Sequence, residues 1–269
     1  MILKIAWRNI WRSKVRSFIV LTSIAIGIWA GLLIIGFSFG MNNERTAAAI
    51  GSTLGHSQVH SDAFLEEPTS AATIGDAARV TALQQELLEA PFVTGVSVRG
   101  VMMGMVSAPK SARGVRMIAV DPESERENST LPSTIVEGDF FESKTRNSVV
   151  IGAQLAEKLG VGLRKKVVLT FQDGEGNISR ASFRITGIYR TLNSTWDELN
   201  IYIKRSDLKK TIGKDLVHEL MVRYDETEGT EEKTAELAQI LPTGLKILSW
   251  KRNSPELGYA DDMMGIMLV

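Results

Sequence analysis

The sequence predicts an α+β fold in which a body of mixed strands and helices follows an N-terminal transmembrane helix. A charge-free, mostly apolar run of 22 residues extends from Phe18 to Phe39. Beyond it, two strand-helix-strand patterns enclose a middle stretch that is richer in strands. Helices packed on one sheet are the simplest way to bury the apolar faces of such a pattern.

The apolar run is long enough to cross a bilayer, and we assign the transmembrane helix to residues 18–41. A helix of 22 residues rises about 33 Å, against a hydrocarbon core of about 30 Å. Five basic residues and no acidic residue precede the run: Lys4, Arg8, Arg12, Lys14 and Arg16. Because basic flanks stay on the cytoplasmic side, residues 1–17 should be cytoplasmic and the body extracytoplasmic.

A cleaved secretory signal would share this basic start. Its apolar stretch is typically about 7 to 15 residues and ends in a small-residue cleavage site. The small residues Thr46–Ala49 are separated from the run by Glu44 and Arg45. The sequence therefore favours a retained anchor.

Residues 1–17 form a basic amphipathic segment. On a helix, one stripe would carry Trp7 and Trp11 and another would carry the basic side chains, as expected for a helix at a membrane interface. The predicted interface residues are Trp7, Arg8, Trp11, Arg12, Lys14 and Arg16. The alternative is a basic flank that only sets orientation.

Within the predicted span, Ser23, Gly27 and Gly31 recur every four residues. Small residues stacked on one helix face let another membrane helix approach closely, and Gly27-xxx-Gly31 is a GxxxG pattern. Because glycine is common in membrane helices, the partner of this face stays open.

The body, residues 42–257, begins and ends with the strand-helix-strand patterns, assigned to residues 42–120 and 214–257. The first pattern has a strand near Gln58–His60, a helix over Ala77–Ala90 capped by Asp76, and strands at Val96–Ser107 and Arg113–Val120. The second has a strand at Leu216–Tyr224, a helix at Glu231–Leu241 capped by Thr230, and a strand at Leu245–Trp250. Apolar spacing, capping residues and prolines define these elements.

Residues 121–213 are predicted to form a β-rich insertion. Strands at Lys166–Phe171 and Ala181–Tyr189 flank Asp173-Gly174-Glu175-Gly176, which is typical of a hairpin turn. A short helix is expected over Ala153–Leu159 and should end at Gly160.

Residues 258–269 are apolar after Asp261 and Asp262, and we interpret them as the start of a second transmembrane helix. Seven apolar residues cannot span a bilayer. The alternative is a C-terminal strand that packs into the core.

Two stretches of this chain resemble a known family. Residues 5–17 (IAWRNIWRSKVRS), running into SIAIG at 23–27, look like the opening of permeases of the MacB, FtsX and lipoprotein-releasing (LolC/LolE) family. VVIG at 149–152, LAEKLG at 155–160 and KVVL at 166–169 resemble its extracytoplasmic core domain. In that domain a porter-like α+β subdomain carries an inserted β-rich subdomain.

The resemblance implies a permease subunit of an ABC transporter in the cytoplasmic (inner) membrane, with a periplasmic main domain. Such permeases have four transmembrane helices and work as homodimers or heterodimers with a cytoplasmic ABC ATPase. They move lipoproteins, drugs or peptides. The expected partners are therefore that ATPase, a second permease subunit, the lipid bilayer and an extracytoplasmic carrier or adaptor protein.

The sequence gives no sign of catalysis, a cofactor or a metal. It has no cysteine and no GxxxxGK[ST] loop, so thiol chemistry and nucleotide binding by a P-loop are excluded. If their segment is extended, His56 and His60 lie about 13 Å apart, too far to share a metal. Gly51–Gly55 has threonine where a nucleophile elbow needs serine, and we interpret it as a loop.

Charge also limits the partners. Basic and acidic residues number 31 each, and without the five that precede Phe18 the basic residues are outnumbered by five. A nucleic-acid partner, which needs a basic patch, is therefore not expected.

Trp196 lies in a polar segment, residues 193–198, that we read as a loop. It would either contact a partner protein, as exposed tryptophans often do, or pack under its own hairpin. Two alternatives to a permease remain: a single-span anchored binding or adaptor protein, and an anchored extracytoplasmic enzyme for which no catalytic constellation is present.

Overall fold

The computed structural model describes Trp7 and residues 14–141 and 145–267, with the side chains of 264–267 left out. The chain divides into two units. One comprises residues 1–44 and 261–269, and the other comprises residues 45–260. From here on, "the body" means this second unit, residues 45–260, in place of the predicted range 42–257. Each is described by itself.

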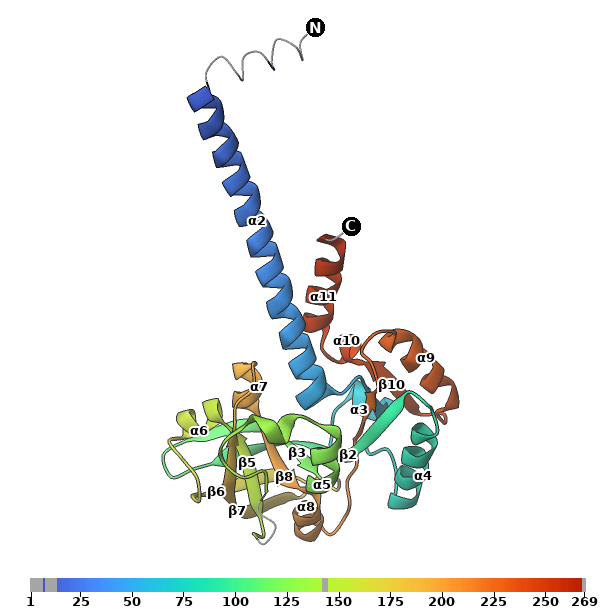
Figure 1. Ribbon diagram of the computed structural model, residues 1–269. Coiled ribbons are helices and arrows are strands. Elements are labelled where there is room, and N and C mark those ends of the chain that lie inside the picture. The colour runs from blue at the N-terminus through green and yellow to red at the C-terminus, as the bar shows by residue number, and fades with distance from the viewer. Residues whose placement is uncertain (1–6, 8–13, 142–144, 268–269) are drawn as a thin grey trace. The chain divides into compact units, whose positions relative to one another are not determined.

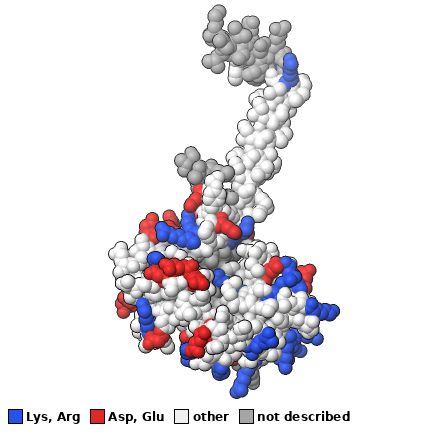
Figure 2. Space-filling model, turned by 180° about the vertical axis from the view of Figure 1, so that it is seen from behind, with Lys and Arg blue, Asp and Glu red and all other residues white. Residues whose placement is uncertain are grey.

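A single helix, α2 (Lys14–Ala49), contains the predicted span of residues 18–41 (Figure 1). Its mean hydropathy reaches 2.5, and none of that apolar window is buried. Within the part of the chain that the structure describes, it is the one helix long and apolar enough to cross a membrane. Its surface carries no charged side chain over most of its length (Figure 2).

Helical structure continues beyond the predicted end of the span. After Ala49 the chain forms a π-helical turn, η1 (Ile50–Leu54), so the loop predicted for Gly51–Gly55 is wrong. The hydroxyls of Ser52 and Thr53 donate to the carbonyls of Ala48 and Ala49 at 2.6 and 2.9 Å, which keeps them inside the helical pattern. Gly55, with φ of 67°, ends it, because positive φ is accessible to glycine without a Cβ clash.

The body is built on one ten-stranded sheet with the order β10-β1-β9-β2-β3-β8-β5-β7-β4, and β6 pairs with β2 and β7. The strands are β1 (Ser57–Ser61), β2 (Val93–Ser107), β3 (Ala112–Val120), β4 (Ile135–Gly138), β5 (Ser148–Gly152), β6 (Lys166–Gln172), β7 (Ile178–Tyr189), β8 (Asn200–Lys204), β9 (Glu219–Tyr224) and β10 (Leu245–Ser249). Most neighbours are antiparallel, and the β3–β8 and β5–β7 pairs are parallel.

Short helices cover the sheet and connect its strands. They are α3 (Asp62–Glu66), α4 (Ala77–Leu88), α5 (Pro122–Asn128), the 3-10 helix η2 (Leu131–Thr134), α6 (Ala153–Leu159), α7 (Ser194–Leu199), α8 (Arg205–Ile212), α9 (Thr230–Ile240) and α10 (Trp250–Asn253). Helix α11 (Pro255–Met267) follows α10 in the chain and connects no strands.

The long strand β2 joins two parts of the sheet. Its first half pairs with β9 from Val93 to Arg99, and its second half pairs with β3 from Arg99 to Ser107. The first part has its own core under α4 and α9, which includes Val80, Leu83 and Leu87. The second part has a separate aliphatic core among β5–β8 and α6. The proposed boundaries at 121 and 213 stay a prediction.

The caps show where the sequence pattern sufficed and where it did not. Asp76 accepts from the amide of Arg79 and starts α4 as predicted. The predicted cap Thr230 is wrong: Gly229, with φ of 70°, occupies that position, and the Thr230 hydroxyl donates to the Thr227 carbonyl at 2.5 Å.

The C-terminal segment is helical, since α11 runs to Met267. The alternative of a C-terminal strand is therefore wrong. That residues 258–269 begin a second membrane helix stays a prediction.

Candidate functional site

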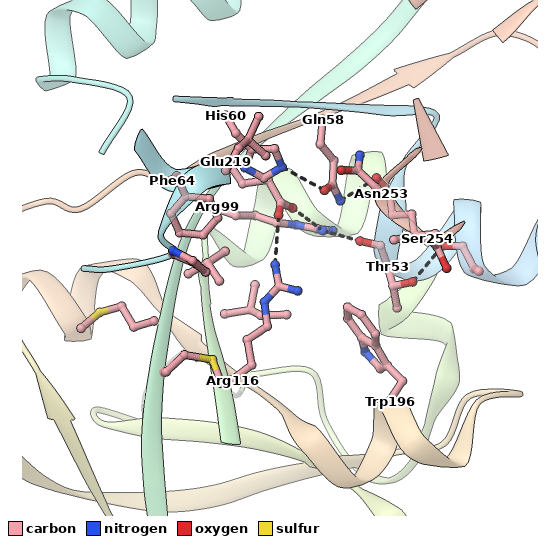
Figure 3. A pocket seen from close by; sticks show the side chains of 18 of the residues that line it. Thr53, Gln58, His60, Phe64, Arg99, Arg116, Trp196, Glu219, Asn253 and Ser254 are labelled. Carbon is pink, nitrogen blue, oxygen red and sulfur yellow. Dashed lines mark hydrogen bonds and ion pairs between the residues drawn. The ribbon is translucent and has the colours of Figure 1, made fainter. Parts of the chain in front are cut away.

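A cavity of about 540 Å³ opens in the body between the two parts of the sheet, and we call it the central cavity (Figure 3). Its lining comes from elements far apart in the sequence. They are the end of α2, η1, β1, α3, β2, β3, β9, the start of α7, and the segment from the end of α10 into α11. The volume lies in the range of about 300–1,000 Å³ that is typical of small-molecule sites.

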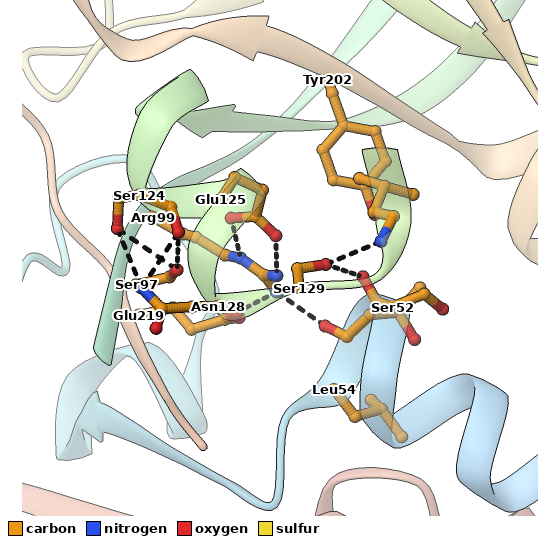
Figure 4. Close-up of polar contacts among 12 residues, drawn as sticks. Ser52, Leu54, Ser97, Arg99, Ser124, Glu125, Asn128, Ser129, Tyr202 and Glu219 are labelled. Carbon is orange, nitrogen blue, oxygen red and sulfur yellow. Dashed lines mark hydrogen bonds and ion pairs between the residues drawn. The ribbon is translucent and has the colours of Figure 1, made fainter. Parts of the chain in front are cut away.

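The floor of the central cavity holds a buried arginine, Arg99, which is 1% exposed. Its Nε donates to Glu125 Oε2 at 3.2 Å and its Nη2 donates to Glu125 Oε1, which makes a two-point ion pair (Figure 4). Its Nη1 donates to Glu219 Oε1 at 3.1 Å and to the carbonyl oxygen of Thr53 at 2.6 Å. We call these four residues the Arg99 joint.

Two neighbouring carboxylates keep the guanidinium of Arg99 ionised. Burial by itself would lower the pKa of Arg99, but the neighbouring carboxylates Glu125 and Glu219 outweigh burial and raise that pKa. A buried guanidinium is tolerated only when it is paired with carboxylates and its donors are hydrogen-bonded, as they are here.

The joint fastens η1 to the sheet, and two further contacts reinforce it. Ser129 Oγ donates to the Ser52 carbonyl at 3.0 Å, and the Thr130 amide donates to the Gly51 carbonyl at 2.8 Å. Three successive carbonyls of η1 therefore accept bonds from β2 and from the α5–η2 connection. These carbonyls lie in the last turn of the helical segment, where the helix itself supplies no amide donors for them.

Arg116, on β3, is the second arginine of the central cavity, and it differs from Arg99. It is 35% exposed, and its Nη2 lies 3.6 Å from Glu219 Oε2, an ion pair longer than a hydrogen bond. Figure 3 shows its side chain projecting from β3 towards Glu219 across open space.

The histidines serve as cross-links. His218 Nδ1 accepts the Val101 amide at 3.0 Å and its Nε2 donates to the Ser70 carbonyl at 3.1 Å. His56 Nδ1 accepts the Tyr224 amide at 3.0 Å. Burial lowers the pKa of both rings, that of His56 to about 4.

His60 lines the cavity in a different setting. Its Nδ1 donates to the His218 carbonyl at 3.0 Å, while its Nε2 lies 3.2 Å from Gln58 Oε1. Gln58 uses its Nε2 to donate to the Leu54 carbonyl. Burial lowers the pKa of His60, against the raising effect of Glu219.

Trp196 lies in helix α7, so the loop predicted at 193–198 is wrong. Asn193 caps this helix by accepting the amides of Thr195 and Trp196 at 3.1 Å. The indole is half-buried, donates to Tyr202 Oη at 3.2 Å and packs against the adjoining core. Trp196 also lines the central cavity, and a contact with a partner protein stays a prediction.

The other predicted site residues lie in the N-terminal unit. Trp7, Lys14 and Arg16 are exposed, whereas Arg8, Trp11 and Arg12 lie outside the described residues. The Ser23 hydroxyl donates to the Ile19 carbonyl at 2.5 Å, and a Cβ added at Gly27 or Gly31 would meet no atom within 4 Å. Close helix packing at this face stays a prediction.

The sequence analysis missed the Arg99 joint. Strand alternation places Arg99 on the face opposite Val96 and Val98, where a polar residue is ordinary, so the local pattern did not mark Arg99 as buried. Its carboxylate partners come from residues 125 and 219, and no local pattern connects these to Arg99. Among the described residues, no group of three His, Asp or Glu side chains could hold a metal ion.

The fold is an α+β body that follows one long apolar helix. The model of the MacB-like periplasmic core domain matches residues 17–240. The chain therefore belongs to the family of proteins with a MacB-like periplasmic core domain, found in permeases of ABC-type transporters.

Solved structures of related domains are similar at low identity. The periplasmic region of MacB from Actinobacillus actinomycetemcomitans is 12% identical, over 79% of this chain and 92% of that chain, with a TM-score of 0.49. The extracellular domain of the ABC-type transporter YknZ from Gram-positive bacteria is 13% identical, over 72% and 100%, with a TM-score of 0.47. No curated protein matches the chain.

Proposed function

We propose that this chain is a permease subunit of an ABC transporter that couples ATP hydrolysis by a separate cytoplasmic ATPase to motion of its extracytoplasmic body. The N-terminus lies in the cytoplasm and the protein sits in the cytoplasmic (inner) membrane. A second permease subunit completes the transporter, and an extracytoplasmic carrier or adaptor receives the cargo. The cargo is a lipoprotein or a lipid-like, drug or peptide substrate.

One observation carries this proposal. The apolar helix α2 passes into η1 without an intervening loop, and three consecutive carbonyls of η1 are tied to the body by Arg99, Ser129 and Thr130. A flexible tether would suit an anchor that only retains the domain. A hydrogen-bonded connection suits a subunit in which displacement of a membrane helix must move the body.

The role is mechanical, and no covalent chemistry is assigned to the chain. The two buried carboxylates of the Arg99 joint, Glu125 and Glu219, are both bonded to Arg99. The histidine nitrogens bond mainly to backbone groups. This supports a non-enzymatic role, because a general base needs a free lone pair directed at its substrate.

The orientation can be tested with single cysteines, since the chain has none of its own. Ser13→Cys should resist a membrane-impermeant maleimide in intact spheroplasts, and Ser194→Cys, at an exposed position of α7, should react. Ser194 is a better reporter than Ser61, which is buried and bonded to the Ala72 carbonyl. The reverse labelling pattern would contradict a cytoplasmic N-terminus.

Coupling can be tested on the same Ser194→Cys variant in native membranes. We expect MgATP with vanadate, which traps ABC ATPases after hydrolysis, to change the maleimide reaction rate relative to MgADP. Gly27→Leu with Gly31→Leu should reduce that change without impairing insertion, because leucine is favourable in hydrocarbon but prevents close helix approach. An ATP-independent rate would favour the alternative, a single-span anchored binding or adaptor protein.

A further inference from the structure

We propose that the central cavity binds an anionic amphiphile, a molecule with one apolar chain and one carboxylate or phosphate group. This inference rests on the proposed transport function, for which it names the class of molecule handled by the body. The inference rests on two observations. One arginine of the cavity is hydrogen-bonded at every guanidinium nitrogen while the other makes only a long ion pair, and the wall beside the second arginine is apolar.

Arg116 is the charged group that a ligand can reach. Arg99 is buried and uses its guanidinium on Glu125, Glu219 and Thr53. Arg116 makes only the 3.6 Å ion pair with Glu219, and none of the hydrogen bonds among the described residues involves its guanidinium. A planar guanidinium with open donors is suited to two-point binding of a carboxylate or phosphate.

The carboxylate side of the cavity is closed to a cationic ligand. Glu219 is only 2% exposed, and its two oxygens face Arg99 and Arg116. Burial lowers the pKa of His60, which disfavours a positive charge on that ring. The accessible charge in the cavity is therefore positive.

Beside Arg116 the wall of the cavity is apolar. Met102 and Met103 on β2 and Ile118 on β3 line the cavity. Phe64 and Trp196 line the same cavity (Figure 3). Met103 is 62% exposed although it lies on a central strand. An exposed methionine beside aromatic rings is an adaptable surface for a flexible alkyl chain.

The position of the cavity along the chain suits a molecule that comes from a membrane. Its lining includes Ala49, the last residue of α2, and Leu257 in α11. Ala49 belongs to the same helix as the apolar run that ends at Phe39. Drug-sized polar molecules would not need this placement, whereas an amphiphile partitions into bilayers.

The test uses the complete chain in nanodiscs of phosphatidylcholine, with dodecanoic acid carrying a terminal diazirine as the photoreactive probe. Cross-linked peptides are mapped by mass spectrometry. We expect labelling at Met103 and neighbouring lining residues, competed by unlabelled dodecanoate but not by dodecanol, acetate or inorganic phosphate at the same concentration.

Two pairs of variants separate the cavity from the surrounding surface. Arg116→Gln should weaken competition by dodecanoate about tenfold, as expected for the loss of a charge-assisted contact, whereas Arg113→Gln on the same strand should not. Met103→Glu should abolish cavity labelling, whereas Met105→Glu should preserve it. Met105 is 43% exposed and lies outside the lining.

Other results would overturn the inference. Equal competition by dodecanol would remove the requirement for an anion, and competition by acetate or phosphate would show that the head group alone binds. Labelling that Arg116→Gln and Met103→Glu leave unchanged would show that the probe only partitions into lipid. Binding needs no ATPase, so normal labelling with no ATP-dependent change would reject the transport function and leave the site in place.

Discussion

Two buried regions of the body are held together in opposite ways. The aliphatic core among β5–β8 and α6 includes side chains such as Ile151, Leu155 and Ile185, all fully buried. The Arg99 joint is equally buried but consists of an arginine, two glutamates and a backbone carbonyl. The first region is stabilised by removal of apolar surface from water, and the second by directional bonds between charges.

The two regions should therefore respond differently to substitution. An aliphatic core tolerates substitutions that conserve volume, because dispersion and burial have little directional preference. The joint requires each partner, since one missing group leaves a buried charge without compensation. Strict geometric requirements are therefore concentrated where η1 meets the sheet.

The largest effect is expected from Arg99→Met. The change leaves Glu125, Glu219 and the Thr53 carbonyl without their shared donor, which should cost about 3–5 kcal/mol of the free energy of unfolding. Urea unfolding of the complete chain in detergent, followed by circular dichroism, measures this loss.

The matched control removes all three charges, as Arg99→Met with Glu125→Leu and Glu219→Leu. It should lose less stability than Arg99→Met alone, because no buried charge is left unpaired. A triple variant less stable than the single one would mean that the joint acts through packing rather than charge.

Gly152→Ala should give the next largest loss. At Gly152 an added Cβ would lie 1.9 Å from the carbonyl oxygen of Asp197, so strand β5 and helix α7 would have to separate. We expect a cost of about 1–3 kcal/mol. Gly162→Ala is the control, since its Cβ would meet no atom within 4 Å, and thermal unfolding should show almost no change there.

Acidification should produce a gradual loss of stability through His56. Burial, aided by Arg223 and Lys233, lowers the pKa of His56 to about 4 from an ordinary value of 6.5. The folded state therefore holds the ring neutral while the unfolded state binds a proton first. The contribution of His56 is complete above about pH 6.5 and falls as pH drops from 6.5 to 4.

The variant His56→Gln isolates this contribution. Its urea midpoint should depend less on pH between 6.5 and 4 than that of the unmodified chain. An identical pH dependence would assign the acid sensitivity to other groups, such as His60 or His218.

The smallest effect is expected in the aliphatic core from a change that removes one methylene group. Ile151→Val should cost about 0.5–1.5 kcal/mol. Arg99→Lys, which keeps the charge but loses the planar fork, should cost more in the same urea experiment, because lysine cannot reproduce the two-point pair with Glu125. Equal losses would remove the contrast between the two regions.

The spacing of apolar and capping residues in the sequence was sufficient to predict the elements that bury one face. Val80, Leu83 and Leu87 at helical spacing behind Asp76 predicted α4, and the Asp173–Gly176 turn predicted the β6–β7 hairpin. Period and capping are local properties, so neighbouring residues contain the information. Helix α7 was not predicted, because the polar residues around Trp196 are typical of a loop. The Asn193 cap and the contacts of Trp196 with the core became evident only in the structure.

The sequence by itself determined the apolar helix, the α+β class, the order of the main strands and helices, and the resemblance to a permease family. Each depends on residues close together in the chain. Only the tertiary structure decided that Arg99, Glu125 and Glu219 meet, that η1 is fastened to them, and that Arg116 and Met103 line one cavity. Those contacts join strands that are distant in sequence, and the free energy of burying a charge depends on every partner that surrounds it.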